Sequence, residues 1–200
     1  MMSKTVSVID DEASVRDAVA MLLETHGLNV SCFEGASAFL AAPFAAGCIV
    51  SDVRMPEISG LDLLRQLQSA GDPRPLLLMT GHGDVELAVQ AIKLGAFDFV
   101  EKPFSNERLV ASVEQALIAS ESSLKSRLEL EDLKGKFQSL SDRQRDTMQL
   151  LVQGLSNKEI GQKLGISPRT VEIHRTWVMT KMSARSIADL VRMSMALGLE

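Results

Sequence analysis

The chain has 200 residues, a net charge of −5, 46% hydrophobic residues and 24% charged residues, a composition typical of soluble globular proteins. This length is sufficient for two domains, because domains cluster at roughly 100 to 150 residues. No apolar run approaches the ~18 residues of a membrane span and no secretory signal pattern opens the chain, so we expect a cytoplasmic protein.

Charge is distributed unevenly along the chain. Residues 1–120 carry 8 Lys and Arg against 16 Asp and Glu, a net of −8, whereas residues 121–200 carry 13 against 10, a net of +3. An acidic surface repels nucleic acid, while a modestly basic one attracts it if its cations gather on one face. The two parts are therefore expected to have different partners.

Residues 5–120 alternate short apolar runs with segments of helical periodicity. The runs are TVSVI, LNVSCF, GCIVS, PLLLMT and FDFVEK. Consecutive apolar residues, as at 76–79, indicate strands that are buried on both faces of a parallel sheet. We predict a doubly wound α/β domain with a five-stranded parallel sheet, which binds its ligand beyond the carboxyl ends of the strands. Cys32 and Cys48 lie in two of these runs without CxxC spacing and are predicted to be reduced core residues.

Acidic side chains follow two of the predicted strands. Asp10 and Asp11 come directly after the first strand, and Asp52 follows the third, so all three should meet at one edge of the sheet. Each pair of carboxylates a few ångströms apart repels by roughly 4 kcal/mol at an effective dielectric constant of about 20. A divalent cation would stabilise the cluster, and ligands that are all oxygen favour Mg²⁺.

Two further strand ends place a hydroxyl and an ammonium group at the same edge. Thr80 ends the fourth predicted strand and Lys102 ends the fifth. These groups would complete a site for an anion beside the carboxylates. The bond between Lys102 and Pro103 is a candidate for the cis isomer, which would direct the lysine toward Asp52.

This set of residues resembles the receiver domains of bacterial response regulators over residues 4–120. The resemblance rests on Asp10, Asp11, Asp52, Thr80, Lys102, Pro103 and the stretch SDVRMPEISG. It implies a CheY-like fold in which the three carboxylates bind Mg²⁺ and Asp52 accepts phosphate from a histidine kinase. It also implies that Thr80 and Lys102 contact the phosphoryl group and that Phe99 is the switch aromatic. Phosphoryl transfer would then depend on positioning and on charge neutralisation.

Two other interpretations of these acids fit the sequence less well. A phosphatase of the haloacid dehalogenase type also forms an aspartyl phosphate, but it requires a second Asp two residues after the nucleophile, where this chain has Arg54. A constitutive DNA binder with an inactive receiver would not need the acids, which are intact. We therefore predict no enzyme activity beyond a transient aspartyl phosphate that hydrolyses slowly.

The segment between the two parts is predicted to be helical. Residues 105–119 have Ser105 as a candidate N-cap and an apolar stripe, so they are expected to form the last helix of the first domain. Residues 121–140 contain no proline and place apolar side chains at three- and four-residue steps. This pattern favours a helical or partly helical linker, with capacity to dimerise, over a flexible coil, although Gly135 and several serines weaken the helix.

From residue 141 the periodicity is helical, and four helix starts carry serine as a candidate N-cap. The serines are Ser141, Ser156, Ser167 and Ser186. Three of them precede Gln, Glu or Asp at capping-box spacing, and the other precedes Pro168 at the first helical position. Gly154 and Gly165 end two helices and leave short turns, as in the helix-turn-helix motif of DNA-binding proteins.

Residues 141–200 resemble the all-α, four-helix DNA-binding domains of the LuxR, NarL and FixJ type through LSDRQRDTMQLLVQGLSNKEIGQKLGISPRTVEIHR. Residues 156–164 would be the positioning helix and residues 168–181 the recognition helix. The resemblance implies base contacts by Glu172, Ile173 and Thr176. It implies phosphate contacts by Lys158, Arg169, Thr170 and Lys181. Trp177 departs from the small or polar residue of the family, and the sequence offers no role for it.

The two resemblances together predict a transcription regulator that is activated by phosphorylation and most similar to the FixJ type, which regulates nitrogen fixation. The predicted domains are a receiver at 1–120, a linker at 121–140 and a DNA-binding domain at 141–200. The expected partners are a sensor histidine kinase, double-stranded promoter DNA, RNA polymerase and, after phosphorylation, a second copy of the chain. No residue itself reports nitrogen metabolism.

Overall fold

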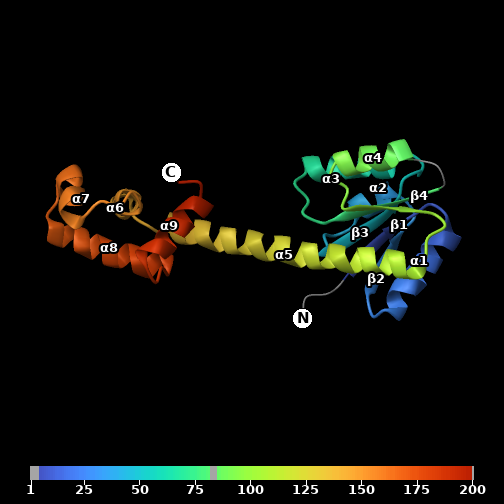
Figure 1. Cartoon of the computed structure of the whole chain (residues 1–200), viewed down its shortest axis with the longest axis horizontal. Coiled ribbons are helices and arrows are strands. Elements are labelled where there is room, and N and C mark those ends of the chain that lie inside the picture. The colour runs from blue at the N-terminus through green and yellow to red at the C-terminus, as the bar shows by residue number, and fades with distance from the viewer. Residues whose placement is uncertain (1–4, 82–84, 200) are drawn as a thin grey trace. The chain divides into compact units, whose positions relative to one another are not determined.

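The computed structural model describes residues 5–81 and 85–199 of the chain. It divides into two compact units, Met1–Leu124 and Lys125–Glu200. The first unit contains a sheet with helices, and the second contains helices alone (Figure 1). No helix in the described ranges is both long and apolar enough to cross a membrane.

A five-stranded sheet forms the centre of the first unit. The strands are β1 (Thr5–Ile9), β2 (Asn29–Phe33), β3 (Gly47–Asp52), β4 (Leu76–Thr80) and β5 (Asp98–Glu101). Their order is β2-β1-β3-β4-β5, and every pair is parallel. The order reverses between β1 and β3, so a crevice forms beyond the carboxyl ends of these strands. The predicted doubly wound sheet is confirmed.

Helices cover both faces of this sheet. They are α1 (Ala13–Thr25), α2 (Ala36–Ala41), α3 (Gly60–Ser69), α4 (Val85–Lys93) and α5 (Asn106–Gln138). Leu77 and Met79 pack in one core with side chains of α1 and α5, whereas Leu76 and Leu78 pack in the other core with side chains of α2, α3 and α4. Alternate residues of a strand point to opposite faces, which explains why the central strands are apolar at consecutive positions.

The edge strand β2 differs from the sequence prediction. Cys48 on β3 is buried as expected, and burial raises the pKa of its thiol to about 12. Cys32 on β2 is exposed, so its prediction as a core residue was wrong. β2 pairs with β1 alone, and a strand at the edge of a sheet has fewer neighbours to cover its side chains.

Residues 121–138 lie within α5, the helix that begins at Asn106. Ser105 accepts a hydrogen bond from the backbone N–H of Arg108, as expected for its N-cap. Ion pairs at i,i+4 spacing join Lys125 to Glu129 and Asp132 to Lys136 on the exposed surface of this helix. Pairs at this spacing stabilise a helix even where little else packs against it.

The second unit packs four helices and the end of α5 around one core. The helices are α6 (Asp142–Val152), α7 (Asn157–Leu164), α8 (Pro168–Met182) and α9 (Ile187–Ala196). The core contains Leu140, Met148, Leu151, Ile160, Val171, Val178, Met182 and Leu190. Leu133 and Phe137 of α5 pack against it. The predicted four-helix domain is confirmed.

The N-caps of these helices follow the sequence pattern with one difference. Ser141 and Ser156 form complete capping boxes, and Ser167 caps α8 with proline at its start. At α9, Ser186 accepts from the backbone N–H of Asp189, but the Asp189 carboxylate accepts from the backbone N–H of Arg185. The expected capping box at α9 is therefore only half formed, because the shorter Asp side chain bonds elsewhere.

The turn between α7 and α8 is tight. It consists of residues 165–167, and Gly165 has a left-handed φ of 68° that glycine adopts without strain. Inside α7, a Cβ added at Gly161 would lie 2.7 Å from the backbone oxygen of Ile166. This close approach requires glycine and holds the turn against α7.

Candidate functional site

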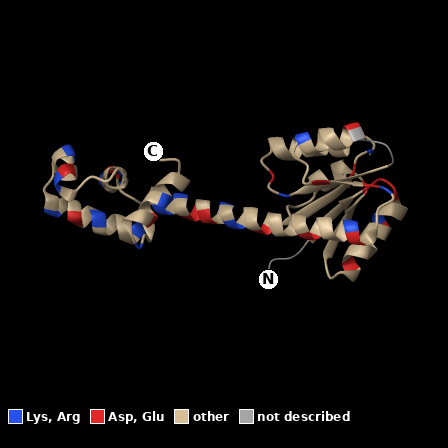
Figure 2. Ribbon diagram, in the orientation of Figure 1, with Lys and Arg blue, Asp and Glu red and all other residues tan. Residues whose placement is uncertain are grey.

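Two buried carboxylates share one ammonium group at the carboxyl edge of the sheet. Asp10 follows β1 and is 1% exposed, and Asp52 ends β3 and is 9% exposed. The Nζ of Lys102 lies 2.9 Å from Oδ2 of Asp10 and 2.5 Å from Oδ1 of Asp52. The peptide bond between Lys102 and Pro103 is cis. Figure 2 shows the acidic connection between β1 and α1 in red at this edge. The predicted approach of these three residues is present in the structure.

The remaining carboxylate oxygens bind backbone N–H groups. Oδ1 of Asp10 accepts from the backbone N–H of Glu12 at 2.9 Å, and Oδ2 of Asp52 accepts from that of Arg54 at 2.6 Å. Each carboxylate oxygen has more than one lone pair, so these bonds fix the side chains without exhausting their capacity to accept.

Burial and the shared ammonium act in opposite directions on Asp52. Burial raises the pKa of the Asp52 carboxyl, and the hydrogen bond and positive charge of Lys102 offset part of that rise. Burial alone would lower the pKa of Lys102, but its hydrogen bonds to Asp52 and Asp10 outweigh this effect and raise the pKa. Lys102 is therefore positively charged at neutral pH and neutralises its two partners.

Asp11 does not join the other two acids. Its side chain is exposed and lines a separate hollow with Glu34 and Glu57. Across residues 5–81 and 85–199, no three Asp, Glu, His or Cys side chains are close enough together to hold a metal ion as they stand. The chemistry of the donors still fits Mg²⁺, which prefers oxygen and commonly binds one or two carboxylates in proteins, because Asp10 and Asp52 supply two adjacent carboxylates.

Thr80 and Phe99 lie on the next two strands of the sheet beyond β3. Thr80 is buried at the end of β4, one residue beyond Met79, which pairs in register with Asp52. The backbone oxygen of Thr80 accepts from the backbone N–H of Lys102 at 2.6 Å. Phe99 is half-buried and packs against the core on the side of α4. The structure thus brings Thr80 to the predicted edge and directs Phe99 into the core.

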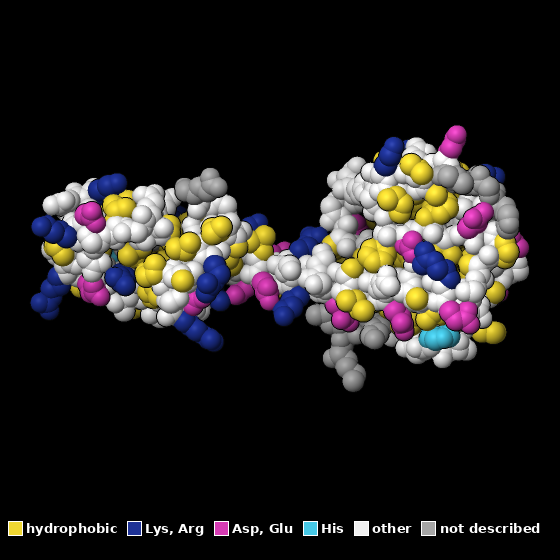
Figure 3. Space-filling model, in the orientation of Figure 1, with side chains coloured by type: hydrophobic (Ala, Val, Ile, Leu, Met, Phe, Trp, Pro, Cys, Tyr) yellow, Lys and Arg dark blue, Asp and Glu magenta, His cyan; other side chains and the backbone are white. Residues whose placement is uncertain are grey.

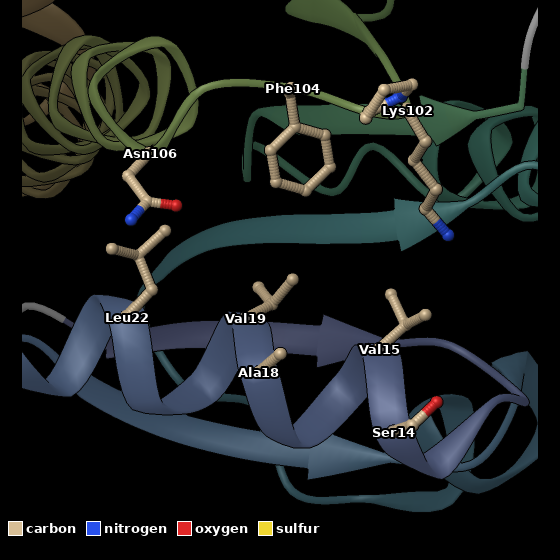
Figure 4. Close-up of a pocket in the computed structure, with 9 residues that line it drawn as sticks. Ser14, Val15, Ala18, Val19, Leu22, Lys102, Phe104 and Asn106 are labelled. Atoms are coloured by element: carbon tan, nitrogen blue, oxygen red, sulfur yellow. The ribbon is translucent and has the colours of Figure 1, made fainter.

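An apolar groove of about 370 Å³ opens beside Lys102, between α1 and the segment that follows β5. Figure 4 shows Phe104 pointing toward Val15 and Val19 of α1, while the Lys102 side chain extends toward the strand ends. No local pattern in the sequence indicates this groove, because it forms between segments far apart in the chain.

One face of α8 is exposed from its first turn to its last. Besides Pro168 at the start of the helix, the exposed residues are Arg169, Glu172, Ile173, Thr176, Trp177 and Thr180. Their spacing of one, three and four residues places them on one side of a helix. The buried Val171, Val178 and Met182 lie on the other side. Thr170 is half-buried, with its hydroxyl 2.8 Å from that of Ser167.

Two of the predicted DNA contacts bond to groups outside α8 and its N-cap. The amide nitrogen of Asn157 on α7 donates to the carboxylate of Glu172. The Nζ of Lys181 donates to the backbone oxygen of Ser139 at 2.7 Å and to Oε1 of Gln144 at 3.0 Å. Lys181 therefore binds the segment before α6, whereas Lys158 on α7 is exposed. Sequence spacing gave no sign of the bond between Lys181 and Ser139, because it spans 42 residues.

The chain matches two protein-family models in the order that the two units suggest. Residues 6–114 match the response regulator receiver domain, and residues 138–194 match the bacterial regulatory proteins of the luxR family. The transcriptional regulatory protein FixJ of Bradyrhizobium diazoefficiens is 48% identical over 196 residues, which cover 97% of this chain and 96% of FixJ. The chain belongs to the FixJ type of bacterial response regulators.

Other relatives agree with this family. FixJ of Rhizobium meliloti is 44% identical over 203 residues, with 99% of this chain and 98% of the relative covered. Among solved structures, the response regulator StyR has a TM-score of 0.86 at 39% identity, with 96% of this chain and 98% of StyR covered. Full-length FixJ from B. japonicum has a TM-score of 0.61 at 46% identity, with both chains covered completely. This response regulator is a phosphorylation-dependent regulator of transcription.

Proposed function

We propose that Asp52 is the phosphorylated residue of this response regulator and that Asp10 and Asp52 hold Mg²⁺ during phosphorylation, together with Asp11 once its exposed side chain turns toward them. The observation that carries the proposal is the buried pair of carboxylates bridged by Lys102. Two such groups are stable together only if cations neutralise them. An incoming phosphoryl group adds negative charge and needs the same cations.

In the proposed transfer, a carboxylate oxygen of Asp52 attacks the phosphorus of a phosphohistidine. The P–O bond of an acyl phosphate forms, the P–N bond breaks, and the imidazole leaves with the electron pair. Lys102 binds the phosphoryl oxygens in place of the Asp52 carboxylate, and the Thr80 hydroxyl donates to them. Mg²⁺ supplies additional neutralisation of these oxygens when bound. Phe99 is the switch aromatic that responds to the movement of Thr80.

The proposed receiver spans 1–120, the linker 121–140 and the DNA-binding domain 141–200, all in the cytoplasm. The receiver has no turnover on external substrates beyond slow hydrolysis of its own aspartyl phosphate. The histidine kinase contacts the groove beside Lys102, because a donor must approach Asp52 from that edge. A phosphatase assay on small phosphate esters tests the absence of turnover, and sustained hydrolysis would contradict it.

Phosphorylated chains form dimers that bind double-stranded promoter DNA and engage RNA polymerase. Two recognition helices in a symmetric dimer reach half-sites about 10 base pairs apart. Glu172, Ile173 and Thr176 contact bases. Contacts to phosphate come from Lys158, Arg169, Thr170 and Lys181, the last after its bond to Ser139 opens. A regulator of C4-dicarboxylate transport, DctR of Rhodobacter capsulatus, is also 44% identical to this chain.

The experiment is phosphorylation of Asp52→Asn by acetyl phosphate with and without Mg²⁺. We expect intact-mass spectrometry to detect one phosphoryl group on the wild type with Mg²⁺, and none on the variant or after chelation. Asp17→Asn, which alters an exposed acid on α1, is the matched control and should be phosphorylated normally. Equal phosphorylation of Asp52→Asn and the wild type would refute the assignment.

A further inference from the structure

Trp177 has no role in the fold that accounts for its size. It is 52% exposed on α8, in a unit whose core is complete without it. A large aromatic side chain is usually buried to a high degree. Its position in the middle of the exposed face of α8, rather than in the core, indicates that its partner is outside the unit.

Trp177 shares this face with Ile173, which is 53% exposed. The two lie four residues apart and therefore on the same side of the helix, separated by about 6 Å along its axis. Figure 3 shows hydrophobic side chains over α8 with Lys and Arg side chains around them. The two residues form an apolar shelf on a helix that is otherwise polar on its exposed side.

The charges around this shelf identify its occupant as nucleic acid. Helices α7 and α8 together, residues 157–182, carry 5 Lys and Arg against 2 Asp and Glu, a net of +3. Arg169 is exposed on the same side as the shelf, and Lys158 is exposed on α7. A polyanion is attracted by such a surface, whereas an apolar partner protein would not require it.

The only apolar groups on the base edges of the major groove are the methyl groups of thymine. When the helix lies along the groove, the distance of about 6 Å between Ile173 and Trp177 is close to the rise of two base pairs, which is roughly 7 Å. We propose that Trp177 is a specificity-determining residue that contacts a thymine methyl group, about two base pairs from the base contacted by Ile173. The inference rests on α8 being the recognition helix.

Fluorescence of the intact protein tests this contact directly. The chain contains one tryptophan and no tyrosine, so the emission reports Trp177 alone. The probe is a duplex selected from a random pool by the full-length chain phosphorylated with acetyl phosphate. We expect the emission to change with the same concentration dependence as binding measured by anisotropy of the labelled duplex. Unchanged emission at saturating duplex would overturn the proposal. An emission change that follows protein concentration in the absence of DNA would also overturn it.

Substitution of the protein and of the DNA identifies the base. Replacing the contacted thymine by deoxyuridine removes one methyl group and should weaken wild-type binding about fourfold, which corresponds to burial of one methyl group. Trp177→Ala should weaken binding to the thymine duplex by about tenfold and should show no further loss with deoxyuridine. If Trp177→Ala still distinguishes every thymine from deoxyuridine as the wild type does, the proposal is wrong.

Three variants on α8, with a control on α9, separate this inference from the proposed role of α8. Met195→Ala removes a side chain that is 72% exposed on α9 and should leave binding unchanged. Arg169→Ala should weaken DNA binding and should reduce the slope of log affinity against log salt concentration by about one, the amount for one phosphate contact. Trp177→Ala should leave this slope unchanged. Loss of binding in Ile173→Ala and Arg169→Ala but not in Trp177→Ala would refute the inference alone. Normal binding in all three would refute α8 as the recognition helix.

Discussion

Lys102 holds together two acids that would otherwise repel each other in a buried place. The geometry explains why this end of β5 requires a cation: Asp10 and Asp52 are almost inaccessible to water, and both bond to its Nζ. Phosphorylation of Asp52 would replace one of these carboxylates by a larger anion at the same position. The pocket therefore requires a cation both before and after transfer.

Lys102→Met should destabilise the first unit by about 3 kcal/mol, because removal of one partner leaves buried carboxylates without compensation. Mg²⁺ should then raise the stability of the variant more than that of the wild type, because the ion neutralises the same acids. Urea unfolding followed by circular dichroism, with and without Mg²⁺, measures both effects. Equal stabilisation of the two proteins by Mg²⁺ would contradict a metal site at these carboxylates.

Asp98 at the start of β5 supplies a pH-dependent connection to α5. Burial alone would raise the pKa of its carboxyl, but hydrogen bonds from Arg108 and Ser112 outweigh burial and lower the pKa. Because the pKa of Asp98 is lower in the folded protein than in the unfolded chain, where it is near 3.9, the charged carboxylate stabilises the fold at pH above 3.9. This stabilisation is lost as the pH falls through the pKa of the folded state.

Asp98→Asn should therefore reduce stability by about 1 kcal/mol at neutral pH, because a partly exposed charged hydrogen bond is lost. The difference between the variant and the wild type should shrink as the pH falls below about 4. Urea midpoints measured across this range test the prediction. A difference that stays constant with pH would show that the Asp98 charge is not involved.

At the scale of elements, local sequence signals predicted most of the fold and part of the site. The carboxyl ends of parallel strands meet at one edge of a sheet, and this rule correctly predicted that Asp10, Asp52 and Lys102 lie together. It succeeded because it depends only on the topology of the sheet. Asp11 departed from it, since the chain has already left the strand there and the side chain turns to solvent. The exposure of Cys32 was not predictable, because no local signal tells an edge strand from a central one.

Two glycines in helices should respond to alanine in opposite directions. Gly161→Ala should destabilise the second unit by about 1 to 3 kcal/mol, because its Cβ would press on the backbone of Ile166 in the helix-turn-helix. Gly135→Ala should stabilise the chain by up to about 1 kcal/mol, since a Cβ there meets nothing within 4 Å and alanine favours helix. Thermal unfolding of both variants checks the signs, and a stabilising Gly161→Ala would exclude the close contact.

At the scale of the whole molecule, the two cores of the first unit share no residue with the core of the second unit. Leu23 belongs to the first unit and Ile160 to the second, and both are fully buried. Separate cores predict separate unfolding, which a single two-state analysis would misinterpret. Trp177 reports on the second unit alone, whereas circular dichroism reports on both.

Leu23→Ala should lower the stability of the first unit by about 2 to 5 kcal/mol, the range for large-to-small substitutions in a core. The unfolding transition that tryptophan emission reports should be unchanged in this variant, because Leu23 and Trp177 belong to different units and substitutions at independent sites act separately on stability. Ile160→Ala should shift the tryptophan transition by a similar amount. If Leu23→Ala shifts the tryptophan transition as much as Ile160→Ala does, the two units unfold as one.

The accessibility of the two thiols has a practical consequence for following this regulator in action. Cys32 is exposed in the first unit, Cys48 is buried with a pKa of about 12, and the only indole belongs to the second unit. A maleimide dye at neutral pH, where the reagent prefers thiols to amines, would therefore attach at one place. The unaltered chain thus already contains a donor and an attachment point for resonance energy transfer, one in each unit, so that the distance between them can be recorded as phosphate arrives.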